Sequence, residues 1–241
     1  MANQEKSLAS KANNAQDIEV PENWPQDIVY MTDQTYSSAV TDEQRIALSR
    51  TLSDDATWTQ VRSEALASMR NNINICIISD EKHPARGQRG LFAAQNLAPD
   101  SFIVLYVGHV HTNALSDTDP KSDYDLNLDG EIGLSVDAAR GGNESRCTND
   151  YRGIADRPNA EFRDCYVQVP STKRVGGTKW ERRVAIFVLS AGNAGKRKGG
   201  IRAGEEVLVS YGKGYWEARK RLAGFRKDEE MLRVANAALE E

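Results

Sequence analysis

The spacing of hydrophobic and polar positions changes twice along the chain. Apolar residues over 41–70 recur at loosely helical spacing, and Thr41 precedes two acidic residues as a helix N-cap does, which predicts one or two helices divided near Ser53. Residues 1–40 are polar and broken by two prolines, so we expect a mostly disordered lead-in. Residues 217–239 again carry a helical pattern. The apolar residues able to dock the lead-in on the body are Trp24, Ile28, Val29 and Tyr30.

Between these flanks the spacing is typical of short β-strands. Asp129-Gly130 is a strong hairpin signal between two of them, and Gly176-Gly177 lies within a second predicted hairpin. Many short strands with little helix between them predict a mainly β fold with flanking helices, and not an alternating α/β chain. The predicted strands are 73–78, 87–94, 102–110, 124–128, 132–136, 162–169, 182–189 and 207–211.

Charge is distributed unevenly over the 241 residues. The formal net charge of −4 combines −5 over 1–72, −6 over 73–162 and +7 over 163–241. An acidic total argues against a protein that coats nucleic acid through bulk charge, although the basic third leaves a local contact open. The three cysteines do not suffice for a disulfide scaffold, which suggests a reducing compartment.

Targeting and membrane signals are weak. The sequence holds no stretch of roughly 18 apolar residues, and its first 20 residues contain no apolar core of a secretory signal. We therefore expect a monomer of the cytoplasm or nucleus with no membrane partner.

Several common kinds of active site do not fit the sequence. The cysteines have no zinc spacing, and His109 with His111 finds no obvious third ligand, so we expect no metal. The segment Gly192–Lys196 is too short for a phosphate-binding loop, and no Gly-x-Ser-x-Gly motif of serine hydrolases occurs.

Four short segments stand out together, although each is weak alone. In chain order they are Gly87–Ala93 followed by Tyr106–Gly108, Val136–Ala138, Gly142–Tyr151 followed by Arg157–Asn159, and Ala203–Gly212. In this order, on a strand-rich background, they resemble the SET-domain protein-lysine methyltransferases. The resemblance covers 73–213. It implies a SET domain of small curved β-sheets, with the Asn149 segment threaded as a pseudoknot. It also divides the chain into a lead-in (1–40), N-flanking helices (41–72), the SET domain (73–213) and a C-flanking aromatic segment with a helix (214–241).

The resemblance also implies an activity. Members of the family transfer a methyl group from S-adenosylmethionine to a lysine side-chain nitrogen by direct displacement, with cofactor and lysine entering from opposite faces. It assigns catalysis to Tyr211 and Tyr106, and the lysine channel to Tyr106, Phe162 and Val209. The expected cofactor residues are Arg89, Gly90, Leu91, Asn149, Asp150, Tyr211 and Trp216. No metal is implied.

Three departures from the family pattern leave an alternative open. Asp150 replaces a histidine, and Cys147 and Ala160 also differ from the usual residues. The chain is therefore either an enzyme, since Asn149 and Tyr211 are retained, or a catalytically inactive SET-like binding or scaffold module. A β-rich nucleic-acid reader is a weaker third interpretation, because the strands lack an aromatic and basic stripe.

The flanks and the partner complete the sequence-based hypothesis. No Cys-x-Cys follows residue 212, so Tyr215-Trp216 stands where many relatives have a zinc cluster. The expected partner is a protein or peptide that carries a lysine, a histone included, which favours the nucleus and a role in chromatin regulation. Nucleic-acid contact through the basic C-terminal part is not predicted. We expect an acidic approach for a basic peptide, made of Asp117, Asp119, Asp123, Asp125, Asp129 and Glu131.

Overall fold

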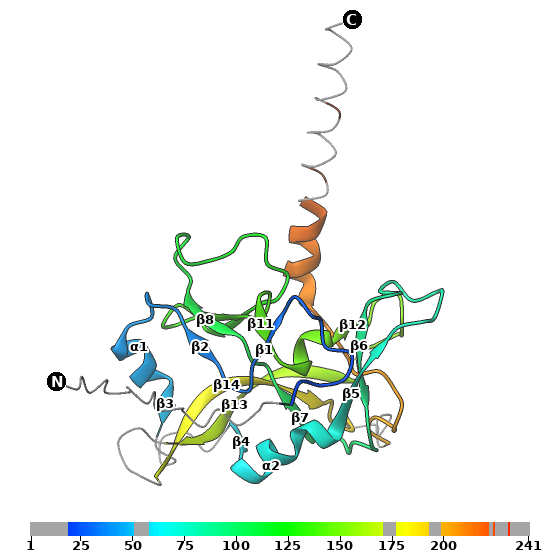
Figure 1. Ribbon diagram of the computed structural model, residues 1–241, viewed down its shortest axis with the longest axis horizontal. Coiled ribbons are helices and arrows are strands. Elements are labelled where there is room, and N and C mark those ends of the chain that lie inside the picture. Colours follow the sequence, from blue (N-terminus) through cyan, green and yellow to red (C-terminus); the bar gives the residue numbers. More distant parts are fainter. Residues whose placement is uncertain are drawn as a thin grey trace, which may run out of the picture.

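The computed structural model describes residues 19–50, 58–170, 177–192, 199–221, 224 and 231, and strands dominate this part of the chain (Figure 1). The strands are β1 (Val29–Tyr30), β2 (Thr35–Tyr36), β3 (Ser49–Arg50), β4 (Thr59–Val61), β5 (Ile73–Ile77), β6 (Arg89–Ala93), β7 (Phe102–Leu105), β8 (His109–Thr112), β9 (Asp125–Asp129), β10 (Leu134–Asp137), β11 (Gly141–Gly142), β12 (Asn149–Asp150), β13 (Ala160–Pro170), β14 (Thr178–Val188) and β15 (Leu208–Val209). The helices are α1 (Asp42–Ala47), α2 (Ser63–Ser68), and the 3₁₀ turns η1 (Met69–Asn72) and η2 (Glu144–Cys147), followed by a helix over 212–221.

The strands form small separate sheets rather than one large one. The largest has the order β3-β14-β13-β4, with β7 also paired to β14, and a second has the order β2-β8-β10-β9. Three two-stranded pairs, β1-β11, β12-β15 and β5-β6, complete the described set. The predicted mainly β fold of small sheets with flanking helices is therefore confirmed.

Both predicted hairpins form. β9 and β10 pair antiparallel around a turn over 130–133, in which Asp129 is the last residue of β9, and β13 and β14 pair antiparallel along their whole length. The segment between β13 and β14, which includes Gly176, lies outside the described residues over 171–176. One predicted strand, 102–110, divides into β7 and β8, because β7 joins β14 whereas β8 joins β10.

Apolar residues of these sheets meet in three adjoining clusters. Phe187 of β14 is fully buried between β13 and β7, and Leu91 and Val209 belong to the cluster beneath the β5-β6 pair. Phe162 on β13 touches two of the clusters and links them. The long β13-β14 hairpin thus supports segments from both halves of the chain.

The N-terminal flank is only partly helical. Thr41 caps α1 with a complete capping box, in which its hydroxyl accepts from the Gln44 N–H while the Gln44 side chain accepts from the Thr41 N–H. The second predicted helix is shorter than expected, since Thr59–Val61 forms strand β4 and pairs with β13. Val61 is 2% exposed in the core, so burial against the sheet overrides the helical spacing. The division predicted near Ser53 lies outside the described residues.

The predicted disordered lead-in does not hold for residues 19–40, while residues 1–18 lie outside the described part. Trp24 is buried at 8% exposure, β1 pairs parallel with β11, and β2 pairs parallel with β8. The polar composition hid this docking because two-residue strands leave little periodic signal.

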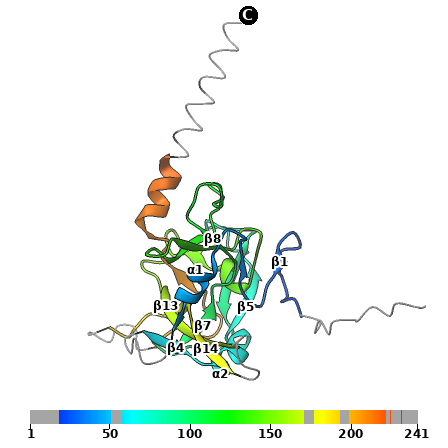
Figure 2. The same cartoon turned by 90° about the vertical axis from the view of Figure 1, so that its left-hand side faces the viewer.

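At the other end, the C-terminal helix starts at residue 212 rather than at 217 and rises away from the sheets (Figures 1 and 2). Across the described ranges, no helix combines the length and apolar character needed to cross a membrane.

Candidate functional site

A cavity of about 270 Å³ lies where Tyr106, the strands β9 and β13, the turn η2, the closing segment (residues 208–211) and the C-terminal helix meet. Its aromatic lining comes from sequence-distant positions, and two carboxylates and one guanidinium also line it. The lining residues are Tyr106, Asp123, Tyr124, Asp125, Leu126, Ser145, Arg146, Thr148, Phe162, Tyr211 and Tyr215. Tyr106 and Phe162, which the resemblance assigned to the lysine channel, thus lie around one cavity with Tyr211, which it assigned to catalysis.

Tyr106 and Phe162 form one wall of this cavity. Their rings meet edge to face with centroids 5.7 Å apart. The Tyr106 hydroxyl donates a 2.6 Å hydrogen bond to the Tyr124 carbonyl oxygen. Burial raises the pKa of Tyr106 well above its ordinary value, and the nearby Asp137 adds to the shift. Tyr106 is therefore a neutral phenol whose free lone pairs can only accept.

Tyr211 forms the opposite wall. Its hydroxyl donates a 2.7 Å hydrogen bond to the Thr148 carbonyl oxygen, and its ring packs edge to face against Tyr215 with centroids 5.0 Å apart. Burial raises the pKa of Tyr211 too, with Tyr215 contributing next. The Thr148 hydroxyl is buried in the same wall and has no hydrogen-bond partner among the described residues. The wall therefore offers acceptor oxygens to a ligand.

Asp150, which stands where the family pattern has a histidine, holds the Tyr211 segment in place. One of its carboxylate oxygens accepts from the Tyr211 N–H at 2.7 Å and from the Trp216 indole N–H at 3.2 Å. The Arg152 guanidinium binds the same oxygen at 2.9 Å. Burial opposes the charge, but these donors, with the Tyr211 N–H the largest, hold the pKa of Asp150 below its ordinary value. The carboxylate thus ties β12 to the closing segment and to the C-terminal helix.

Asn149 lies in a second polar cluster next to Asp150. Its amide nitrogen donates to the Arg89 carbonyl oxygen at 3.2 Å and to a Glu206 carboxylate oxygen at 2.8 Å. The other Glu206 oxygen lies 3.0 Å from His83 Nε2. Both N–H groups of the Asn149 amide are therefore used, and its remaining capacity is the acceptor oxygen.

The Arg89-Gly90-Leu91 segment, predicted to bind the cofactor, packs against other parts of the protein. A Cβ at Gly90 would lie 2.8 Å from Glu206 Oε1 and 2.7 Å from the Phe92 ring, so a larger residue would require these side chains to shift. Leu91 is fully buried in the core, and its carbonyl accepts from the Val207 N–H. The Arg89 guanidinium donates to the Asn23 carbonyl at 2.5 Å. Packing within the protein thus explains the glycine without a ligand.

Two further predicted residues lie away from the cavity. Val209 is fully buried in the core and does not line it, so a role in the lysine channel does not fit its position. Trp216 lies beside Asp150 and Arg152, whereas its neighbour Tyr215 lines the cavity. Of the two adjacent aromatics, Tyr215 therefore lines the cavity and Trp216 does not.

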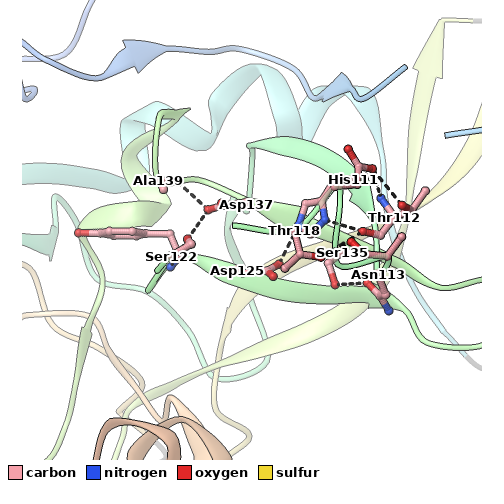
Figure 3. Close-up of polar contacts among 12 residues, drawn as sticks. His111, Thr112, Asn113, Thr118, Ser122, Asp125, Ser135, Asp137 and Ala139 are labelled. Carbon is pink, nitrogen blue, oxygen red and sulfur yellow. Dashed lines mark hydrogen bonds and ion pairs between the residues drawn. The ribbon is translucent and has the colours of Figure 1, made fainter. Parts of the chain in front are cut away.

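A polar network surrounds Asp125, one of the residues that line the cavity (Figure 3). His111, buried on β8, donates through Nδ1 to the Thr112 carbonyl, and its Nε2 lies 3.2 Å from Asp125 of the cavity wall. Burial raises the pKa of Asp125 although His111 acts in the opposite direction. In the same view Asp137 accepts from Ser122 and from the Ala139 N–H. These contacts fix the chain on either side of Tyr124.

The predicted acidic approach contains two structural carboxylates. Asp129 is 6% exposed and forms an ion pair with Arg182. Asp117 accepts from Ser37 and from the N–H and hydroxyl of Thr112. Asp123 and Asp125 are the members of the set that line the cavity, so the acidic approach is narrower than expected.

Sequence reasoning missed several residues of the site. Thr148, Tyr124 and Arg146 line the cavity, and Glu206 with His83 braces Asn149. Thr148, Arg146 and Glu206 lie inside the quoted motifs, whose spacing was the available signal. Tyr124 and His83 carry no local signal, because only tertiary contacts bring them to the site.

Metal-binding chemistry finds no support in the described part of the chain. No group of three or more His, Cys, Asp or Glu residues there is placed to hold a metal ion. Cys76, Cys147 and Cys165 are free thiols. Burial raises the pKa of Cys147 to about 11 and that of Cys165 to about 12, which makes both poor nucleophiles.

Comparisons with known proteins found no matching family model and no matching curated protein. Among solved structures the chain is similar to ctPRC2 in an autoinhibited conformation bound to S-adenosylmethionine, with 24% identity over 64% of this chain and a TM-score of 0.41. It is also similar to the polycomb repressive complex 2 of Chaetomium thermophilum (25% over 58%, TM-score 0.39) and to an active polycomb repressive complex 2 in the stimulated state (25% over 62%, TM-score 0.41). The matches span 17%, 15% and 16% of those chains.

Proposed function

We propose that this protein transfers a methyl group from S-adenosylmethionine to a lysine side-chain nitrogen of a protein substrate. One observation carries the proposal: a narrow cavity gathers Tyr106, Phe162 and Tyr211, and both phenol hydroxyls donate to backbone carbonyls. These are three residues that the resemblance to SET-domain methyltransferases assigns to the lysine channel and to catalysis.

The cavity suits a lysine side chain in size and in polarity. At about 270 Å³ it lies just below the usual range of small-molecule sites. Its rings can pack on the methylene stem of the lysine, while Asp123 and Asp125 attract the ammonium group. A free lysine has a pKa of about 10.4, and desolvation between aromatic rings lowers it towards the neutral amine that attacks.

The donor set also fits the cofactor. S-adenosylmethionine, when bound, would supply a methyl group on a cationic sulfonium, and S-adenosylhomocysteine would leave as the carbon–sulfur bond breaks and the lysine nitrogen takes the methyl group. The acceptor oxygens of Asn149, of Tyr211 and of the unpaired Thr148 hydroxyl suit the positive charge and the amino group of S-adenosylmethionine. Asn149 would hold the amino-acid part, and the backbone of Asp150 the adenine.

Tyr106 and Tyr211 act by position and not as bases. Because their pKa values are raised, both stay protonated, and each hydroxyl proton is held by a backbone carbonyl. The phenol oxygens can therefore orient the amine and stabilise positive charge near the transferring carbon. The proton of the ammonium leaves to solvent through the mouth of the cavity, by which we mean the side where the exposed residues Asp123 and Asp125 lie.

We extend the proposal to the substrate class and the compartment. The two cavity carboxylates favour a basic segment such as a histone tail, which would place the protein in the nucleus, as a monomer acting in chromatin regulation. Phe162 lacks a hydroxyl that would crowd the amine, so more than one methylation is compatible with the cavity.

One observation favours the rival function, an inactive binding module. The Asp150 side chain is fully engaged with Tyr211, Trp216 and Arg152, so a bound cofactor would meet a carboxylate where the family pattern has an imidazole. The module would bind the lysine peptide without transferring a methyl group.

Two measurements separate these functions. Calorimetry with S-adenosylmethionine and S-adenosylhomocysteine tests for the cofactor site, and absence of binding at millimolar cofactor would contradict the enzyme. Labelled cofactor with a lysine-peptide library tests transfer. We expect Tyr211→Phe and Asn149→Ala to abolish most labelling, while Tyr166→Phe, a buried tyrosine stacked on Trp58 outside the cavity, leaves it unchanged.

A further inference from the structure

The mouth of the cavity is bridged by the chain itself. Arg219, on the helix over 212–221, forms an ion pair with Asp123 on the loop between β8 and β9. The Arg219 guanidinium also lies 5.5 Å from the centroid of the Tyr215 ring. Asp123 and Tyr215 both line the cavity, whereas Arg219 reaches them from outside it. Figure 1 shows this helix rising beside the loop.

The contact follows from helix geometry. Tyr215 and Arg219 are four residues apart and therefore share one face of the helix, which begins directly after Tyr211. Tyr215 on that face lines the cavity, so the Asp123 carboxylate and the Tyr215 ring both contact the Arg219 guanidinium. A carboxylate beside an aromatic face is a combination that binds guanidinium well.

We infer that Asp123 and Tyr215 form a guanidinium-binding subsite at the mouth of the cavity, which Arg219 fills until an arginine next to the substrate lysine displaces it. This inference rests on the proposed function, because it gives the substrate an arginine beside the lysine that enters the cavity. The subsite selects arginine-flanked lysines, and Arg219 competes with them.

A substrate arginine can replace Arg219 because the ion pair between Arg219 and Asp123 is exposed to solvent. The side chains of Arg219 and Asp123 are 43% and 39% exposed, so water screens their attraction. A substrate arginine offers the same guanidinium to the same two groups. The arginine that lines the cavity is held by internal contacts: Arg146 donates to the Ala138 carbonyl and lies 4.4 Å from the Tyr124 ring centroid.

Lys213 gives a matched control on the same helix. It pairs with Glu217 at 3.5 Å, its side chain is 89% exposed, and neither residue lines the cavity. Removing its charge changes the helix surface by one cation, as Arg219→Gln does, but leaves the mouth intact.

The first test measures peptide binding without cofactor, so that it does not depend on catalysis. The probes are dye-labelled Gly-Arg-Lys-Gly and Gly-Gln-Lys-Gly amides, followed by fluorescence anisotropy. We expect Arg219→Gln to bind the arginine peptide about two- to fivefold more tightly, with the glutamine peptide unchanged. Asp123→Asn should weaken the arginine peptide by a similar factor, and Lys213→Gln should match wild type. Equal effects of Arg219→Gln on both peptides, or no effect, would overturn the subsite.

The second test uses methyl transfer to the same peptides. Arg219→Gln should lower KM for the arginine peptide without changing kcat, and Asp123→Asn should cancel that gain in the double variant. If the binding pattern holds but no variant transfers methyl groups, the subsite stands and the proposed enzyme fails. If transfer occurs and Arg219→Gln leaves KM unchanged, the enzyme stands and the subsite fails.

Discussion

The inner wall of the cavity and its mouth are built on different principles. On the inner wall, which here means the facing walls of Tyr106 and Tyr211 together, both hydroxyls donate to backbone carbonyls, and Asp150 accepts from the Tyr211 N–H through a side chain that is 5% exposed. At the mouth, Asp123 and Arg219 meet through two exposed side chains. Buried contacts to the backbone fix a geometry, whereas an exposed ion pair exchanges partners readily.

The difference teaches where each function can reside. Direct displacement requires close alignment of the amine and the methyl carbon, so the proposed transfer needs the fixed geometry of the inner wall. Recognition of a flexible peptide tolerates adjustment, so it can use the mouth. Substitutions on the inner wall should therefore lower turnover or stability, and substitutions at the mouth should change the affinity for substrate.

The largest effect is expected for Tyr211→Phe. Loss of the hydroxyl removes an oxygen near the transferring carbon and should lower kcat by about 100-fold. Stability should fall by only about 1 kcal/mol, for the lost bond to the Thr148 carbonyl. Rate assays with labelled cofactor and urea unfolding check both values. Turnover equal to that of the control Tyr166→Phe would remove Tyr211 from the site.

Gly90→Ala should lower the stability of the protein, although Gly90 does not line the cavity. A Cβ at this position meets Glu206 and Phe92 at under 3 Å, and Glu206 is itself held by His83 and Asn149. Overpacking should cost about 1–3 kcal/mol of unfolding free energy. The matched control is Gly130→Ala, where the nearest atom lies 3.5 Å away. If both variants unfold at the same urea concentration, the packing explanation for Gly90 is wrong.

The pH dependence of stability in Asp150→Asn tests how much the Asp150 carboxylate stabilises the inner wall. Since the folded-state pKa of Asp150 lies below its ordinary value of 3.8, the carboxylate stabilises the fold above that pH, and the contribution is lost as pH falls through the folded-state value. At pH 7 the variant should be about 1–3 kcal/mol less stable than wild type, and the gap should close in acid. Urea midpoints from pH 7 to pH 2.5 measure it. A gap independent of pH would mean that the charge of Asp150 is not what matters.

The smallest effect is expected at the mouth. Asp125→Asn should raise KM for a basic peptide about two- to fivefold and weaken its salt dependence, with kcat unchanged. Asp80→Asn, on a carboxylate that does not line the cavity, is the control. A fall in kcat instead would place Asp125 with the inner wall, through its contact with His111.

Sequence patterns predicted the parts of the fold that local chemistry controls. Asp129-Gly130 marked its hairpin, and Thr41 capped its helix, because a turn and a cap are decided within a few residues. The pattern failed at Thr59–Val61, where pairing with β13 replaced the predicted helix, and over 19–40, where short strands dock on sheets distant in sequence.

The candidate site divides in the same way. Motif order brought Tyr106, Asn149 and Tyr211 into one hypothesis, and the structure places Tyr106 and Tyr211 around one cavity with Asn149 in the adjoining polar cluster. It did not separate Val209, which lies in the core, from the cavity, because the packing that buries Val209 comes from residues distant in sequence. Nor did it find Tyr124, which lines the cavity, accepts from Tyr106 through its carbonyl and packs its ring against Arg146.

The sequence by itself determined the β-rich architecture, the turns and the residue types that any lysine-directed chemistry here would use, since strand spacing, glycine and capping act locally. Only the tertiary structure decided that Gly90 serves to accommodate Glu206, that Asp150 braces Tyr211, and that Arg219 spans the mouth to Asp123. The physical reason is that these contacts join residues far apart in the chain, 61 positions for Asp150 with Tyr211 and 96 for Asp123 with Arg219. Side-chain packing and hydrogen bonding between such segments leave no periodic trace in the sequence.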